Sequence, residues 1–204
     1  MIIQIHPENP NPREINKVIE CLKDGGVIVY PSDTVYGIGC DIFNRKAVER
    51  IARIKGINVK KNNFSFVCSD LSHISDFTKQ LGTPTYKLMK RNLPGSFTFI
   101  LHANSNVPKL FKNNKKTVGI RIPNHNIPRE IVQLLGNPLL TTSVKNEDRL
   151  IEHITDPYVI YERMKNDVDI VIDAGFLGVI PSTIIDCTKD EFEIIRQGKG
   201  EIIF

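Results

Sequence analysis

The stretch Gly26-Val-Ile-Val-Tyr-Pro-Ser-Asp-Thr-Val-Tyr-Gly-Ile-Gly-Cys40 decides how this chain builds a site. Its first residues form an apolar run that is typical of a buried strand. Pro31 cannot donate a hydrogen bond to a sheet, so the polar Ser-Asp-Thr that follows should leave the sheet as a loop. Gly37 and Gly39 then allow a ligand or another backbone to come close. The simpler alternative is an ordinary strand–turn–strand whose polar side chains only satisfy the turn.

The length and composition of the chain favour one domain that spans residues 1–204. With 204 residues and 41% hydrophobic content, the chain can bury one sizeable core. It holds no apolar run long enough to span a membrane, and its first residues lack the basic and apolar regions of a signal peptide. We therefore expect a soluble, cytoplasmic protein without a membrane partner.

The sequence holds few signals for metal or redox chemistry. Four cysteines are scattered singly without Cys-x-x-Cys spacing, and the five histidines show no ligand spacing, so buried free thiols and no protein-held metal are expected. The phosphate loop, the dinucleotide fingerprint and the nucleophile elbow are also absent. The net charge of +4 is compatible with an anionic ligand but is too small by itself to indicate nucleic acid.

Helix and strand signals alternate along the chain, which predicts an α/β protein. Helices are expected after the caps Asn11 and Asn44, and near 83–91, 127–135 and 157–165. Strands are expected at 27–30, 64–68, 97–101, 118–122, 139–143, 170–173, 183–186 and 193–196. Because several strands follow one another without a helix between them, the sheet should be mixed rather than purely parallel.

Cationic side chains gather at two places in the sequence. Lys46, Arg50 and Arg53 recur at helical spacing, which is more typical of a solvated helix face than of a site. Lys55 and Arg121 lie at predicted element ends beside polar turns, where an anion site and a surface salt bridge are equally good interpretations.

Several short motifs together resemble the YrdC domain over essentially the whole chain. They are Tyr30-Pro-Ser-Asp-Thr-Val-Tyr-Gly37, Arg53-Ile-Lys-Gly56, Pro94-Gly-Ser-Phe-Thr98, Val118-Gly-Ile-Arg-Ile-Pro123, Leu140-Thr-Thr-Ser143, Pro181-Ser-Thr-Ile-Ile-Asp186 and Arg196-Gln-Gly198. The resemblance implies a twisted, mixed α/β sheet around a positively charged cavity. It also implies threonylcarbamoyl-adenylate synthesis from L-threonine, bicarbonate and ATP, for the threonylcarbamoyladenosine modification of transfer RNA.

The implied reaction explains why the sequence shows no nucleophile or base cluster. The carbamate formed on the threonine amine attacks the α-phosphate of ATP, so the substrate supplies the nucleophile. Catalysis then rests on positioning and on cations directed at the phosphates, usually with Mg²⁺. No residue of the chain is therefore assigned a catalytic role of its own.

The resemblance assigns binding roles residue by residue. Thr34, Arg121 and Ser182 would contact threonine, with the guanidinium clamping the carboxylate in bidentate fashion. The ATP side would be lined by Lys55, Asn63, Thr117, Ser143 and Arg196. Asn63, Thr117 and Ser143 could equally be ordinary turn or strand residues.

Three departures from the synthase pattern direct attention to the YciO branch of the family. Synthases usually carry Lys-x-Arg where this chain has Lys55-Gly-Ile57, and Ser-x-Asn where it has Ser143-Val-Lys145. Cys68 stands where a histidine often ends the strand. Losing the guanidinium removes a charge-assisted contact worth about 1.5–3 kcal/mol. The segments that begin at Lys60 and Met89 resemble the YciO branch more than the synthases.

Two functions of different class therefore remain open at the level of the sequence. In the first, the chain is a synthase whose activity is weakened at Ile57 and Lys145. In the second, the cavity binds a nucleotide or RNA without that chemistry, and the protein acts as a translation-associated factor, since family members resemble double-stranded RNA binders. Lysines added near the site would favour a phosphate-rich partner through salt-sensitive contacts.

Overall fold

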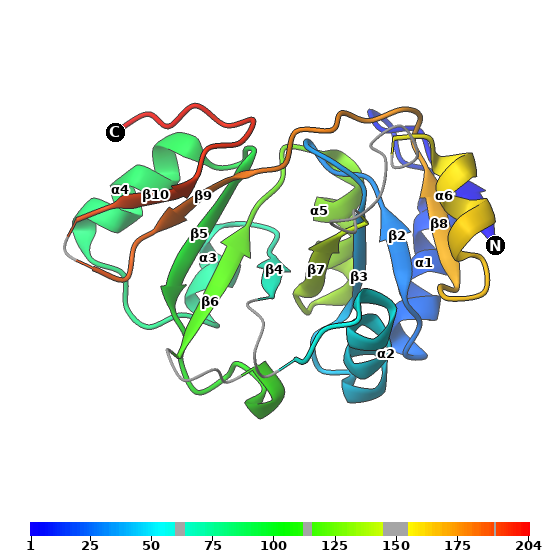
Figure 1. The fold of residues 1–204 in the computed structure, drawn as a ribbon, viewed down its shortest axis with the longest axis horizontal. Helices are drawn as coiled ribbons and strands as arrows, with labels where there is room; N and C mark the ends of the chain where they lie inside the picture. The colour runs from blue at the N-terminus through cyan, green and yellow to red at the C-terminus, as the bar shows by residue number, and fades with distance from the viewer. Residues whose placement is uncertain (60–63, 112–115, 145–154, 190) are drawn as a thin grey trace.

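A computed structural model describes residues 1–59, 64–111, 116–144, 155–189 and 191–204. The described chain forms one twisted, ten-stranded sheet with the order β1-β8-β2-β3-β7-β4-β6-β5-β9-β10 (Figure 1). Both parallel pairs, such as β4 with β6, and antiparallel pairs, such as β3 with β7, occur in it. The prediction of a mixed α/β sheet is confirmed.

The strands of the sheet lie close to the predicted ranges. They are β1 (Ile2–Gln4), β2 (Ile28–Tyr30), β3 (Gly37–Asp41), β4 (Ser65–Val67), β5 (Phe97–His102), β6 (Thr117–Arg121), β7 (Leu139–Ser143), β8 (Ile170–Asp173), β9 (Thr183–Asp186) and β10 (Glu193–Arg196). The predicted ranges did not include β3, for which the sequence indicated only that the strand resumes after the polar loop, and β1 was not predicted at all. This strand has three residues, which is too short for a periodicity to show.

The helices begin and end where local chemistry predicts. They are α1 (Pro12–Lys23), α2 (Arg45–Lys55), α3 (Leu71–Ser75), α4 (Thr83–Asn92), α5 (Asn126–Leu135) and α6 (Pro157–Met164), with a 3₁₀ turn η1 (Lys109–Phe111). The side chains of Asn11 and Asn44 cap α1 and α2 as expected, and Gly56 ends α2 with a φ of 65°. The five-residue α3 was not predicted.

Two hydrophobic clusters cover the two faces of the sheet. One face packs against buried residues of α2, α3, α4 and α6, and the other packs against α1 and α5. The second face changes character along its strands. Leu139 of β7 and Val67 of β4 belong to the cluster under α1 and α5, whereas Thr141 and Ser65, two residues away on the same face, line a cavity.

No helix in the described part of the chain is both long and apolar enough to cross a membrane.

Candidate functional site

A polar cavity of about 210 Å³ opens on the face of the sheet beyond α1 and α5. Strands β3, β4, β5, β6 and β7 supply its floor, and the segments before β9 and at the end of β10 supply one wall. Five of the eight residues predicted to bind substrate line it: Thr34, Arg121, Ser143, Ser182 and Arg196. The structure therefore brings together residues that lie up to 162 positions apart in the sequence.

The loop after β2 holds Thr34 in a fixed position. The Ser32 hydroxyl donates to the Val35 carbonyl at 2.6 Å and accepts from the Thr34 amide at 3.2 Å. The Ser32 and Thr34 hydroxyl oxygens lie 3.0 Å apart, and both side chains are buried. The polar loop thus satisfies its own turn, and its side chains also line the cavity.

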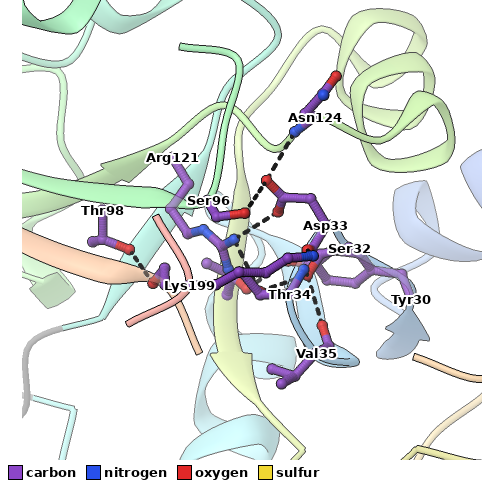
Figure 2. A network of polar contacts seen from close by, with 12 residues as sticks. Tyr30, Ser32, Asp33, Thr34, Val35, Ser96, Thr98, Arg121, Asn124 and Lys199 are labelled. Atoms are coloured by element: carbon purple, nitrogen blue, oxygen red, sulfur yellow. Dashed lines mark hydrogen bonds and ion pairs between the residues drawn. The ribbon is translucent and has the colours of Figure 1, made fainter. Parts of the chain in front are cut away.

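Arg121, at the end of β6, is the central cation of this network (Figure 2). Its Nη2 donates to Asp33 Oδ1 at 3.0 Å and to Thr34 Oγ1 at 3.2 Å. The side chain is only 11% exposed, and its buried Nε has no hydrogen-bond partner among the described residues. Because both Nη2 protons are already donated, a ligand carboxylate could be clamped in the expected bidentate fashion only if one of these bonds were exchanged.

Asp33 is fully engaged within the protein. Its second carboxylate oxygen accepts from the Ser96 hydroxyl and from the Asn124 backbone amide, both at 3.1 Å (Figure 2). Asp41 and Asp186, two further carboxylates beside turns, likewise accept hydrogen bonds from neighbouring amides. Within the described residues there is no group of three metal-ligating side chains. These three carboxylates are therefore held singly by hydrogen bonds and not as a cluster.

Ser182 and Arg196 form the opposite wall. The Ser182 hydroxyl lies 2.8 Å from the Thr98 hydroxyl. The backbone carbonyl of Ser182 accepts a hydrogen bond from Arg196 Nη2 at 2.8 Å. Partial burial and the positive charge of Arg121 lower the pKa of the Arg196 guanidinium. The positive charges of Arg121 and Arg196 thus face one cavity, and an anionic ligand would reduce the repulsion between them.

The other predicted residues are placed less uniformly. Lys55 Nζ donates to the backbone carbonyl of Ser143 at 3.0 Å, which puts it beside the cavity. Thr117 begins β6 and lines a different cavity, with Lys79 and Phe111, so the structure does not bring it to the side chains around Arg121. Asn63 lies outside the described residues.

The structure shows the surroundings of two of the three residues that depart from the synthase pattern. Ile57 is partly buried and packs against the main core, so an apolar contact replaces the guanidinium. Cys68 is fully buried directly after β4, where burial raises the pKa of its thiol well above its ordinary value and keeps it neutral. Lys145 lies outside the described residues.

Some expectations about individual side chains need correction. Lys46 and Arg53 lie on a solvated helix face as predicted, whereas Arg50 is partly buried and pairs with Asp169 at 2.7 Å. Cys40 and Cys68 are buried as expected, whereas Cys21 and Cys187 are only partly buried. These errors have one cause: tertiary partners that are distant in the sequence decide exposure.

Several residues that shape the site were not predicted from the sequence. Thr98 lines the cavity beside Ser182, while Ser96 and Asn124 hold Asp33. Thr98 and Ser96 belong to the motif Pro94-Gly-Ser-Phe-Thr98, so the sequence did hold a signal that could have identified them. Lys199, whose Nζ donates to the Asp33 carbonyl at 2.6 Å, had no sequence signal.

Comparison with known proteins agrees with this geometry. The model of the Sua5, YciO and YrdC domain family, described as "Telomere recombination", matches residues 20–198. The chain belongs to this family. The uncharacterized protein YciO of Escherichia coli K12 is 39% identical over 199 residues, covering 97% of this chain and 95% of that protein. The crystal structure of E. coli YciO superposes with a TM-score of 0.91 at 38% identity, covering 98% and 97% of the two chains.

More distant relatives carry a named activity. A threonylcarbamoyl-AMP synthase of Coxiella burnetii is 29% identical to this chain over 181 residues. The match covers 88% of this chain and 95% of that protein. The crystal structure of P. abyssi Sua5 complexed with L-threonine matches with a TM-score of 0.86 at 25% identity. That match covers 97% of this chain and 57% of the Sua5 chain. The family and its YciO branch, both predicted from motifs, are confirmed.

Proposed function

We propose that this protein binds L-threonine and ATP in the cavity around Arg121 and forms threonylcarbamoyl-adenylate, at a rate reduced relative to the synthases of the family. The observation that carries the proposal is the meeting of Thr34, Arg121, Ser182, Ser143 and Arg196 in one cavity. A hydroxyl-lined, cationic cavity suits a substrate that carries a hydroxyl and a carboxylate together with a polyphosphate.

The proposed reaction conserves atoms without a protein nucleophile. The neutral amine of threonine adds to carbon dioxide, which is in equilibrium with bicarbonate, and the proton lost from nitrogen passes to solvent. A carbamate oxygen then attacks the α-phosphorus of ATP, and the bond to the bridging oxygen breaks to release pyrophosphate. What the protein must supply is alignment of the two reactants and compensation of charge.

Each side of the cavity supports one reactant in this proposal. The Thr34 hydroxyl and the Arg121 guanidinium, fixed by Asp33, would receive the threonine side, with Ser182 completing that subsite. The phosphates and the nucleoside of ATP would bind at the end of the cavity formed by Arg196, Ser143 and the adjoining Lys55. Magnesium is proposed only as the counter-ion of the ATP phosphates, since the nearby carboxylates are engaged elsewhere. The cytoplasmic location remains a prediction.

A second candidate follows from Ile57. Its side chain packs against the core, where a family synthase would place a guanidinium, so the nucleotide end of the site is weaker in charge. In this alternative the cavity retains a nucleotide or an RNA end without turnover, and the protein acts in translation as an RNA-binding factor.

One assay separates the two candidates. Pyrophosphate release from ATP is followed with L-threonine and bicarbonate, each omitted in turn, and the nucleotide product is identified by chromatography. Release that requires both substrates, with a new adenylate, supports the synthase. Absence of release from folded protein that still binds ATP or duplex RNA by titration supports the second candidate.

A further inference from the structure

Lys199 lies across the wall of the cavity from the loop that carries Thr34. Its ammonium donates to the Asp33 carbonyl at 2.6 Å, although 166 positions separate the two residues (Figure 2). Asp33 immediately precedes Thr34 and pairs with Arg121. Lys199 is exposed and lies outside the residues that line the cavity, so its ammonium is held at the rim, next to the loop that carries Thr34.

The backbone that carries Lys199 is fixed rather than loosely draped. Its amide donates to the Pro181 carbonyl at 2.8 Å. The Thr183 hydroxyl donates to the Gly200 carbonyl at 2.6 Å and accepts from the Gly198 amide at 3.0 Å. A Cβ on Gly198 would lie 2.3 Å from the Pro181 carbonyl oxygen, so the turn sits directly against the start of β9. The lysine side chain is thus presented from a rigid support.

The charge balance of the cavity leaves Lys199 available to an anion. Arg121 is already compensated by the carboxylate of Asp33. Lys199 and Arg196 form no ion pair with any of the described residues. Lys199 also uses only one of its three ammonium protons on Asp33, so it can keep that bond and donate to a ligand.

We propose that Lys199 is a substrate-binding residue that donates to the carboxylate of the threonine substrate and sets the affinity for it. The proposal rests on the proposed function and deepens it by naming a second cation for the threonine side. Arg121 has committed both Nη2 protons to Asp33 and Thr34, which leaves the protons on Nε and Nη1 for a ligand. A second cation beside Thr34 would share the two oxygens of a carboxylate with them.

The test compares wild type with Lys199→Met and Lys199→Arg in the pyrophosphate assay, with threonine and ATP varied separately. We expect Lys199→Met to raise the KM for threonine about tenfold or more, as loss of a charged hydrogen bond does, while the KM for ATP changes less than twofold. Lys199→Arg should recover most of the affinity. Lys189→Met, which removes an exposed lysine paired with Glu193, is the matched control.

Titration calorimetry supplies a second readout that does not depend on turnover. L-threonine should bind wild type more tightly than L-threoninamide, which lacks the carboxylate, and this preference should shrink in Lys199→Met. Two results with folded Lys199→Met would overturn the role of Lys199 and leave the synthase proposal intact. One is an unchanged KM and an unchanged affinity for threonine; the other is a loss of affinity, for example about threefold, that is equal for L-threonine and L-threoninamide. A wild-type protein that neither binds threonine nor releases pyrophosphate would overturn the proposed function and, with it, this role.

Discussion

The carboxylate of Asp33 lies 3.0 Å from the guanidinium of Arg121, although 88 positions separate them in the sequence. Their side chains are only 7% and 11% exposed. The pair joins the loop after β2 to the end of β6, and it fixes the cation that faces the cavity. Structure and site therefore depend on the same contact.

Replacing Asp33 by alanine should destabilise the fold and the site together. A buried guanidinium would lose its counter-charge, which costs about 3 kcal/mol when one partner of a buried pair is removed. Urea unfolding should show a lower midpoint, and threonine binding should weaken. Glu49→Ala, which breaks the exposed pair with Arg45, should leave the midpoint unchanged. Equal stability of the Asp33 variant and wild type would argue against a structural role for the buried pair.

Arg121→Lys should retain the charge but lose the planar fork that reaches both Asp33 and Thr34. We expect threonine affinity to fall by ten- to a hundredfold, corresponding to about 1.5–3 kcal/mol for a charged hydrogen bond. Calorimetric titration of the folded variant measures this directly. Full affinity in the variant would show that the ammonium suffices and that the ligand does not require the guanidinium.

Ile57→Arg combined with Lys145→Asn should raise synthase turnover about tenfold, because the first substitution restores the guanidinium and the second the amide of the synthase pattern. Some stability should be lost, since Ile57 packs against the core. The pyrophosphate assay and a thermal melt of the same sample separate the two effects. Turnover that stays level or falls in a folded double variant would show that other positions limit the reaction.

Acidification should destabilise the protein through two histidines. Burial lowers the folded-state pKa of His125 and of His73 below the ordinary value of 6.5. The unfolded chain therefore binds more protons in this window, so stability is full above about pH 7 and declines as the pH falls through 6.5. Urea midpoints at about pH 7.5 and pH 5.5 measure the decline. His125→Asn should reduce it, because asparagine can still accept from the Ile127 amide without titrating. A decline of the same size in His125→Asn would assign it to other groups.

Gly198→Ala should disturb the turn that supports Lys199. The new Cβ would meet backbone atoms of Pro181 and Ser182 at 2.3 Å and 2.5 Å, and overpacking of this kind costs about 1–3 kcal/mol. Thermal unfolding should occur earlier than in wild type. Gly82→Ala, whose Cβ would have no neighbour closer than 3.8 Å, is the matched control. If both variants melt alike, the turn must be able to move away from β9.

The sequence by itself determined the class of the fold, the family and most of the residues around the cavity. Helix caps such as Asn11 and Asn44 and the apolar runs act locally, so their consequences can be read in order along the chain. The motifs carried Thr34, Arg121 and Ser182 because each motif is a short, contiguous piece of backbone.

Tertiary structure alone decided which of those residues meet and what each side chain already holds. The pairing of Asp33 with Arg121, the position of Thr117 at another cavity and the reach of Lys199 to the Asp33 carbonyl depend on strand order and register. The two contacts of Asp33 join residues 88 and 166 positions apart, and no local propensity encodes them. The physical reason is that burial and ion pairing are properties of the packed sheet, whereas caps and turns are properties of a few consecutive residues.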